Sequence, residues 1–599
     1  MIKVSDYIVK RLEEYGIKHI FMISGGGAMH LNDSIGKSEK ISYICNHHEQ
    51  ASAIGAEGYS KVSGKLGVVC VTTGPGGINT LNGVFGQWTD SVPVLYISGQ
   101  VKHETTIHSC PEINLRQLGD QEVDVVSIVS PITKYAKMLT DPYEIGMVLD
   151  KAIYTATHDR PGPVWIDIPM NVQGALIDES KLVKYSPEKD KIQVNYSRLQ
   201  SDTDFIVRLL NKSGRPVIVA GNGINISGTK KEFKNIIKLL NIPVVTTFNG
   251  FDLLHNDHPL FIGRIGTVGQ RAGNFALQNA DLVLFLGTRN NIRQVSYNWQ
   301  TSTADAERIV VDIDPSELLK PTIKPGIPIC ADLKDFFNAF STSLNKYEKN
   351  NTEWIKWCQE RKSKYDPGIN PEYLKNSGKI NLYYFMLKLT ELMPEKTVAV
   401  TGNGSACVGM FQAGICKKNQ RIFWNSGDAS MGYDLPAAIG ACIANNGRDV
   451  ICLAGDGSLM MNIQELQTVK HYNLPIKLFI LNNDGYISIR QTQNNFFKGR
   501  LTACSKDTGV SMPDFIKVAQ AFDLPVKRIE DQESLKLELE KVLNTKGPVI
   551  CEIMLDDNYI FTPKLSSEKL PDGKMISKPL EDMYPFLDRD EFKSNMIIK

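Results

Sequence analysis

The sequence has almost no net charge and no concentration of basic residues. Its 599 residues include 67 lysines and arginines against 66 aspartates and glutamates, which gives a formal net charge of +1. A nucleic-acid-binding protein usually carries a basic face, so we expect no nucleic-acid partner.

The sequence also lacks paired cysteine motifs and long uncharged apolar runs. Its eleven cysteines are scattered singly, without a Cys-x-x-Cys pair. This favours a reducing compartment over a disulfide framework. The stretch 1–21 has apolar residues at helical spacing broken by charges, unlike a signal peptide, and no run approaches the ~18 apolar residues of a membrane span. We therefore expect a cytoplasmic protein with no membrane partner.

Short apolar runs that alternate with helix-period segments are abundant. The composition, 42% hydrophobic and 22% charged, is typical of soluble globular proteins, and the chain is too long for a single core. Runs such as 67–72, 216–220 and 476–482 are rich in β-branched residues. The alternation predicts an α/β fold, with several domains of parallel sheets flanked by helices.

Two polar stretches, around 178–197 and 362–379, divide the chain into three blocks of similar size. The predicted organisation is an N-terminal domain at 1–175, a linker at 176–198, a middle Rossmann-like domain at 199–345, a linker at 346–378, a C-terminal domain at 379–560 and a tail at 561–599. The first and last blocks share one order: strand, glycine-rich turn and helix, then a proline-containing strand, then a strand after Gly-Pro-Val. We expect a pseudo-symmetric pair with a ligand between its strand ends.

In the last block one acid stands between two glycines, at Gly455-Asp456-Gly457-Ser458. Glycines let a backbone approach a ligand closely, and free N–H groups of Gly457 and Ser458 at a helix start would favour phosphate. A carboxylate there would repel phosphate unless a divalent cation lay between them, and Mg²⁺ prefers oxygen ligands.

A second set of oxygen ligands follows the next apolar run, at Asn482-Asn483-Asp484-Gly485. If the two runs are adjacent parallel strands, Asp456 and Asn483 lie at neighbouring carboxyl ends. The amide oxygen of Asn483 and the carbonyl oxygen of Gly485 are neutral ligands. Either motif alone is more often a turn, but the pair, each after a strand, is much more specific.

This pair resembles the diphosphate–metal signature of thiamine diphosphate (ThDP) enzymes. The resemblance implies ThDP as cofactor, with Mg²⁺ held by Asp456, Asn483 and the carbonyl of Gly485. The further cofactor-binding residues that it implies in this region are Gly457, Ser458, Tyr486 and Ile487.

The stretch 401–441 also resembles that family. There Gly404 and Ser405 would help to hold the diphosphate, and the carbonyl of Ala429 would accept from the 4'-amino group of the cofactor. Met431 matches the bulky residue wedged under the bend between the two rings, although alone it is equally well a core methionine.

In the first block, the segment 43–64 matches the family's activating-glutamate segment. The carboxyl of Glu49 would hydrogen-bond the pyrimidine N1' and promote the imino form that removes the C2 proton, a form of acid–base catalysis. The alternative is a helix-start glutamate favoured by the macrodipole. His47 and His48 are expected to be structural or rim residues, and Glu57 to lie on the helix.

The resemblance covers residues 1–560 and is closest to the acetohydroxyacid (acetolactate) synthases, through stretches such as TTGPGGINTLNGV and MGYDLPAAIGA. It implies a carboligase that decarboxylates a 2-keto acid, pyruvate, and transfers the two-carbon unit to a carbonyl acceptor. Gln121 matches a glutamine that reaches the active site in that group. The resemblance further implies a homodimer or homotetramer with sites at subunit interfaces.

The sequence departs from the synthases where the acceptor is chosen. A tryptophan of that group becomes Thr492 and a methionine becomes Arg490, which suggests a larger, more polar pocket. Transfer of an acetyl unit to a nucleotide-linked keto sugar and simple 2-keto acid decarboxylation or lyase activity therefore remain alternatives. An inactive cofactor-holding protein is disfavoured, because Glu49 and Asp456 are both present.

In the synthases the middle domain holds FAD in a non-redox role, through segments that match RIGTVGQ and GTRNN, and Arg289 aligns with one such contact. Some relatives leave this domain empty, and the acids Asp312 and Asp314 also suit a simple strand-end turn. FAD is therefore left open.

Overall fold

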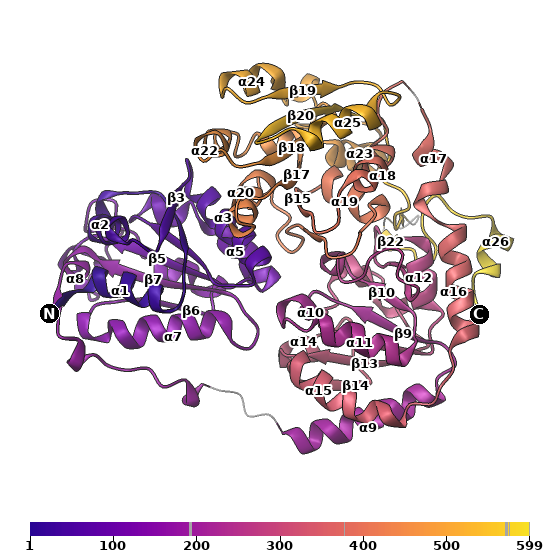
Figure 1. Cartoon of the computed structure of the whole chain (residues 1–599), viewed down its shortest axis with the longest axis horizontal. Helices are drawn as coiled ribbons and strands as arrows, with labels where there is room; N and C mark the ends of the chain where they lie inside the picture. Colours follow the sequence, from indigo (N-terminus) through magenta and orange to yellow (C-terminus); the bar gives the residue numbers. More distant parts are fainter. Residues whose placement is uncertain (191–194, 377, 570–572, 574, 598–599) are drawn as a thin grey trace.

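The computed structural model describes residues 1–599 except 191–194, 377, 570–572, 574 and 598–599. Three six-stranded sheets, all parallel, form the centres of three helix-covered regions (Figure 1). The predicted α/β architecture is confirmed. Among the described residues, no helix has both the length and the apolar character needed to cross a membrane.

The first sheet has the order β3-β2-β4-β5-β7-β6. Its strands are β2 (His19–Met22), β3 (Ser42–Cys45), β4 (Gly67–Val71), β5 (Val94–Gln100), β6 (Tyr135–Met138) and β7 (Pro163–Pro169). Its helices are α1 (Val4–Glu14), α2 (Met29–Lys37), α3 (Glu49–Ser63), α4 (Pro75–Ile78), α5 (Leu81–Asp90), α6 (Val125–Val129), α7 (Ile145–Thr157) and α8 (Met170–Gln173).

The third sheet repeats this topology, with the order β16-β15-β17-β18-β20-β19. In both sheets the second strand in chain order lies at one edge beside the first, and the fifth lies at the other edge. Its strands are β15 (Val398–Thr401), β16 (Arg421–Phe423), β17 (Val450–Gly455), β18 (Ile476–Asn482), β19 (Val526–Ile529) and β20 (Val549–Met554). Its helices are α17 (Pro371–Leu374), α18 (Leu382–Leu392), α19 (Ser405–Ala413), α20 (Asp434–Ala444), α21 (Asp456–Leu459), α22 (Glu465–His471), α23 (Ile487–Phe496), α24 (Phe515–Ala521) and α25 (Leu535–Asn544).

The middle sheet has the order β11-β10-β9-β12-β13-β14, which is the strand order of dinucleotide-binding domains. Its strands are β9 (Pro216–Ala220), β10 (Val244–Thr246), β11 (Phe261–Arg264), β12 (Leu282–Leu286), β13 (Glu307–Asp312) and β14 (Ile327–Cys330). Its helices are α9 (Tyr196–Lys212), α10 (Gly223–Ile226), α11 (Lys230–Leu240), α12 (Arg271–Gln278), α13 (Ile292–Val295), α14 (Pro315–Leu319), α15 (Leu333–Ser343) and α16 (Thr352–Lys364).

The two segments expected to be linkers carry structure of their own. In the first, β8 (Leu176–Ile177) pairs antiparallel with β1 (Ile2–Lys3). In the second, α16 packs on the middle sheet, where the indole of Trp354 donates to the carbonyl of Pro216 at 3.0 Å. Trp354 is 5% exposed, so apolar burial holds this helix to the middle domain.

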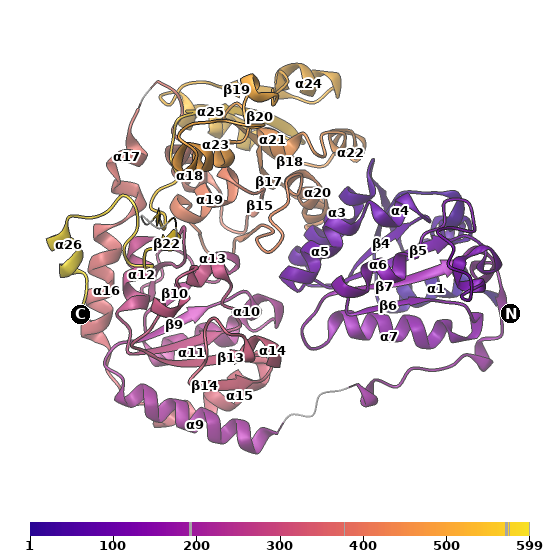
Figure 2. The same cartoon turned by 180° about the vertical axis from the view of Figure 1, so that it is seen from behind.

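The described part of the tail lies against the middle domain (Figures 1 and 2). It forms a hairpin of β21 (Ser567–Lys569) and β22 (Met575–Ser577) and ends in α26 (Arg589–Ser594). The side-chain amide of Asn274 in α12 donates to the carbonyl of Leu580 at 2.9 Å, and Leu580 is buried with residues of the middle sheet.

Helices α3 and α20 cross at close range and join the first domain to the third (Figure 1). A Cβ built at Gly58 would lie 2.1 Å from the carbonyl oxygen of Ala437, and one at Gly440 would lie 1.8 Å from that of Gly55. Only glycine lets the two backbones approach so closely.

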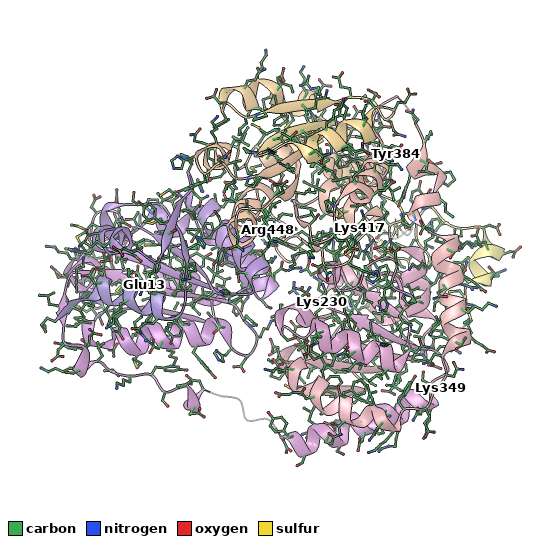
Figure 3. The ribbon with its side chains drawn as sticks, in the orientation of Figure 1. Glu13, Lys230, Lys349, Tyr384, Lys417 and Arg448 are labelled. Atoms are coloured by element: carbon green, nitrogen blue, oxygen red, sulfur yellow. The ribbon has the colours of Figure 1, made fainter. Side chains whose placement is uncertain are left out.

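Buried charges occupy the junction of the three domains. The ammonium of Lys61 in α3 lies 2.8 Å from Glu57 and 2.9 Å from Asp90. Arg421 of the third domain pairs with Asp252 of the middle domain at 2.8 Å and donates to the Lys61 carbonyl at 3.0 Å. Nearby, the ammonium of Lys230, labelled in Figure 3, donates to the carbonyl of Asp252. Charges buried this deeply are stable only when paired, so the junction favours one relative placement of the domains.

Candidate active site

Strands β17 and β18 are parallel neighbours, and the predicted metal ligands follow their carboxyl ends. Oδ2 of Asp456 accepts the backbone N–H groups of Asn483 and Gly485, both at 3.0 Å. Asp456 is 2% exposed and Asn483 3% exposed. The structure therefore brings together the three residues that the sequence had separated into two motifs.

The side-chain amide of Asn483 has hydrogen-bond partners for its nitrogen but none for its oxygen. Its Nδ2 donates to Oγ of Ser405 and to the phenolic oxygen of Tyr559, each at 3.2 Å. Its Oδ1 is buried and has no hydrogen-bond partner among the described residues. An orphaned buried acceptor is costly, and a cation bound there would remove the cost.

Burial raises the pKa of Asp456 to about 6, although three backbone N–H groups oppose the shift. One of them is the N–H of Gly457, which donates to Oδ1 at 2.7 Å. That N–H group is therefore not free, contrary to the expectation from the sequence. A cation beside the carboxylate would favour its ionised form.

Three other predicted cofactor residues meet at the start of α21. A Cβ built at Gly457 would lie 2.3 Å from the ring of Tyr486 and 3.4 Å from the terminal methyl of Met431. The ring of Tyr486 thus leaves no room for a side chain at position 457, while Met431 makes an ordinary contact there. Ile487, at the start of α23, is 5% exposed and lies in the apolar core.

Ser458 uses its side chain within the protein. Its hydroxyl donates to Oδ2 of Asp434 at 2.6 Å and accepts the N–H of Gly432 at 2.8 Å. Its predicted contribution to phosphate binding is therefore left to its backbone. Burial raises the pKa of Asp434 to about 6.

The turn after β15 supplies Gly404, with φ 58°, immediately before α19. Across from it, Ala429 also has positive φ, 59°, a strained conformation for a residue with a side chain. The carbonyl of Ala429 accepts from Nδ2 of Asn403 at 2.7 Å. A carbonyl has two lone pairs, so one remains for the predicted contact with the cofactor.

Glu49 is the first residue of α3, and His48 caps that helix through its ring nitrogen. The carboxylate of Glu49 accepts from Nδ2 of Asn79 at 2.9 Å. Its Oε1 would lie 3.8 Å from a Cβ built at Gly76, and the carbonyl oxygen of Gln121 would lie 2.2 Å from one built at Gly74. Glu49 and Gln121 therefore flank the same glycine-rich turn.

The segment before Glu49 is anchored by the third domain through Glu465 of α22. Its carboxylate accepts the side-chain amide of Asn46 at 2.9 Å and the backbone N–H of His47 at 2.8 Å. Sequence reasoning missed Glu465, and also Tyr559 and Asn403, because each is defined only by a contact made over a long sequence separation.

Within one chain, the described hydrogen bonds do not connect Glu49 with the Asp456–Asn483 group. Exposed apolar side chains occur on elements of both domains. They are Ile78, Phe85 and Trp88 on α4 and α5 of the first domain, and Met460, Met461 and Ile489 after α21 and on α23 of the third domain. Contiguous exposed apolar patches are typical of interaction surfaces.

The two residues taken from the sequence as signs of a larger acceptor pocket have local roles. The guanidinium of Arg490 donates to the carbonyl oxygens of Asn483 and Asp484, both at 2.6 Å. The hydroxyl of Thr492 donates to the carbonyl of Ser488 at 3.0 Å within α23. Arg490 thus holds the loop that carries the predicted metal ligands, which removes the support it gave to a polar pocket.

A cavity of about 390 Å³ opens at the carboxyl ends of the middle strands and reaches the first domain. Its lining includes Gly223, Thr288, Arg289, Arg293, Asp312 and Asp90. A Cβ built at Gly223 would lie 2.7 Å from Cα of Gly287. Such glycine-lined turns at strand ends let a ligand approach the backbone closely.

Three family models match the chain, and together they cover most of it. They are the thiamine pyrophosphate enzyme N-terminal TPP binding domain at residues 2–128, the central domain at 203–340, and the C-terminal TPP binding domain at 402–553.

Curated relatives match over nearly the whole chain. The acetolactate synthase large subunit of Lactococcus lactis is 32% identical, covering 94% of this chain and 94% of its own length. The probable acetolactate synthase large subunit of Methanocaldococcus jannaschii is 31% identical, covering 92% of each. The chloroplastic acetolactate synthase 1 of Zea mays is 30% identical, covering 94% of this chain and 87% of the relative.

Proposed function

The chain belongs to the thiamine pyrophosphate enzymes, close to the acetolactate synthase large subunits, and we propose that it is a ThDP-dependent carboligase acting on pyruvate. The observation that supports this most strongly is the Asp456–Asn483 pair at the ends of adjacent strands, with one amide oxygen unpartnered. Pyruvate is the 2-keto acid donor, and a second molecule of pyruvate is the carbonyl acceptor.

Mg²⁺ fits the oxygen atoms present. Asp456, Asn483 and the carbonyl of Gly485 would hold it, one charged and two neutral ligands, as suits a small cation shared with a diphosphate. No group of three or more His, Cys, Asp or Glu side chains suited to a metal occurs among the described residues. The proposed ligand set contains only one side chain of these four types, that of Asp456, so it would not form such a group.

When bound, ThDP would supply a nucleophilic carbon and an acceptor for the electron pair released on decarboxylation of a 2-keto acid. Glu49 would hold a proton at the pyrimidine ring, and Asn79 keeps its carboxyl in place at 2.9 Å. Met431 would support the two rings, and the carbonyl of Ala429 would accept from the amino group of the cofactor. Tyr486, packed on Gly457, helps to exclude water from the start of α21.

The comparisons do not favour the alternatives of a keto-sugar acceptor or a simple decarboxylase. The named relatives are acetolactate synthases, and Arg490 is engaged with loop carbonyls. An acceptor site for a second 2-keto acid is therefore the simpler proposal. Gln121, exposed beside the Glu49 turn, is proposed to reach this acceptor.

The complete site requires a second copy of the chain. The exposed apolar side chains of α4 and α5 and those after α21 and on α23 would be buried if the first domain of one subunit faced the third domain of another. A symmetric dimer of this kind would contain two equivalent sites. We propose a homodimer, or a homotetramer built from such dimers.

The cavity of the middle domain is proposed to hold FAD. The glycine turn at Gly223, the flanking Arg289 and Arg293, and the Rossmann strand order suit a dinucleotide. Asn249, in the cavity wall, has a buried Oδ1 without a partner among the described residues. An absorbance band at about 450 nm in the purified protein is expected for a bound flavin. The absence of this band after reconstitution with FAD would contradict the assignment.

Product analysis tests the proposed reaction. The purified chain is incubated with pyruvate, ThDP and Mg²⁺, and the products are identified by mass spectrometry. Acetolactate that requires both cofactors is expected. Acetaldehyde alone would indicate a decarboxylase, and a product that forms only when a nucleotide-linked keto sugar is added would revive the sugar acceptor.

A further inference from the structure

Tyr559 lies beyond the last strand of the third sheet and turns back onto the proposed cation site. It follows β20 and is 8% exposed. Gln491 of α23 holds this segment at two points: its Nε2 donates to the carbonyl of Tyr559 at 3.0 Å, and its Oε1 accepts the N–H of Phe561 at 3.3 Å. The phenol is therefore fixed by its own backbone as well as by burial.

The phenol closes a triangle with Ser405 and Asn483. Its oxygen accepts from Nδ2 of Asn483 at 3.2 Å and shares a hydrogen bond with Oγ of Ser405, which itself accepts from Nδ2 at 3.2 Å. Asn483, the predicted metal ligand, and Ser405, predicted to hold the diphosphate, thus contact the same hydroxyl. Tyr559 is supplied by a loop that contains none of the family motifs found in the sequence.

Counting the hydrogen-bond donors and acceptors of Tyr559, Ser405 and Asn483 shows which of them remain unused. The amide nitrogen of Asn483 faces the two hydroxyl oxygens, which share one of its N–H groups, and this places the buried Oδ1 on the opposite side without a partner among the described residues. One of the two hydroxyl protons is used between Tyr559 and Ser405, and the other is left to donate. The remaining capacity includes one acceptor, suited to a divalent cation, and one donor, suited to a phosphate oxygen.

We propose that Tyr559 is a positioning residue that orients Asn483 and Ser405 toward the divalent cation and the diphosphate, an inference that rests on the proposed function. Tyr559 itself touches neither the cation nor the reacting atoms. It acts by keeping Oδ1 of Asn483, rather than Nδ2, on the side of the cation. Groups that orient metal ligands commonly change metal affinity about 10- to 100-fold when removed.

The substitution Tyr559→Phe tests this inference, because it removes one hydroxyl and retains the ring. ThDP binding to the purified chain is measured by titration calorimetry over a series of Mg²⁺ concentrations. The Mg²⁺ concentration that supports half-maximal ThDP binding is expected to rise about tenfold. This readout requires no turnover.

Tyr96→Phe is the matched control. Tyr96 is also a buried phenol, but it lies in β5 of the first domain, where its hydroxyl donates to Oε1 of Gln87 at 2.8 Å. This variant is expected to lower the thermal midpoint and leave the Mg²⁺ requirement unchanged.

An unchanged Mg²⁺ requirement in Tyr559→Phe, or an equal shift in Tyr96→Phe, would overturn the role of Tyr559 while leaving the proposed function intact. Failure of the parent chain to bind ThDP at any Mg²⁺ concentration would instead reject the proposed function and, with it, this inference.

Discussion

At the scale of single residues, the site depends on carboxyl groups in different surroundings. Asp456 is buried and receives three backbone N–H groups, whereas Glu49 is partly exposed and contacts Asn79. The first arrangement suits a fixed anion beside a cation. The second leaves a carboxyl oxygen available to a ligand that arrives from outside the chain.

Glu49→Gln removes the proposed proton-holding group and keeps the shape of the side chain. Turnover of pyruvate is expected to fall at least about 100-fold, the usual contribution of acid–base catalysis, while ThDP affinity changes little. Steady-state kinetics and calorimetric titration measure the two effects. Glu39→Gln, at an exposed position, is the control, and unchanged turnover in Glu49→Gln would remove Glu49 from the mechanism.

Asp167, in strand β7 of the first sheet, should make stability depend on pH. Burial raises the pKa of its carboxyl to about 7, above the unfolded value of about 3.9. The folded chain therefore holds this proton more tightly than the unfolded chain. The protonated carboxyl therefore stabilises the folded chain fully below about pH 4, and this stabilisation is lost as the pH rises through 7. The free energy of unfolding falls by at most about 4 kcal/mol over this range.

Asp167→Asn is neutral at every pH and isolates this effect. The thermal midpoint of the variant minus that of the parent is expected to become more positive between pH 5 and pH 8. Scanning calorimetry of both proteins over this range provides the comparison. A constant difference would show that Asp167 does not titrate as argued.

At the scale of elements, much of the architecture follows from local pattern. The apolar runs predicted the parallel strands, and the glycine motifs predicted that Asp456 and Asn483 lie at strand ends. Both features could be predicted because consecutive residues determine where a strand ends. Contacts of Tyr559, Glu465 and Arg490 could not be predicted in this way. Each depends on how a loop or helix packs against the site after folding, and the spacing of residues in the sequence does not specify that packing.

The crossing of α3 and α20 gives a prediction at the same scale. Gly58→Ala would place a methyl group 2.1 Å from the Ala437 carbonyl, so the helices must separate, at a cost of about 1–3 kcal/mol. A thermal midpoint several degrees lower is expected. Gly36→Ala is the control, since a Cβ in α2 at that position meets nothing within 4 Å and alanine is the better helix former; equal midpoints for the two variants would contradict the close crossing.

At the scale of the whole molecule, the first and third sheets share one topology and the middle sheet has another. The first and third domains carry the two halves of the proposed site, and the middle domain carries the cavity proposed for FAD. The buried charges of Lys61, Asp90, Asp252 and Arg421 hold all three together within one chain. The exposed apolar side chains of the first and third domains then remain for a second copy.

The most direct test of the central claim, that Glu49 of one subunit and Asp456 of another serve one site, is a mixing experiment. Glu49→Gln and Asp456→Asn chains, each nearly inactive alone, are unfolded together in equal amounts, refolded, and assayed for acetolactate. Random pairing would give about a quarter of the sites both native residues, so about a quarter of the parent activity is predicted. No activity above that of the separate variants, from a mixture shown to contain mixed dimers, would contradict a site shared between subunits.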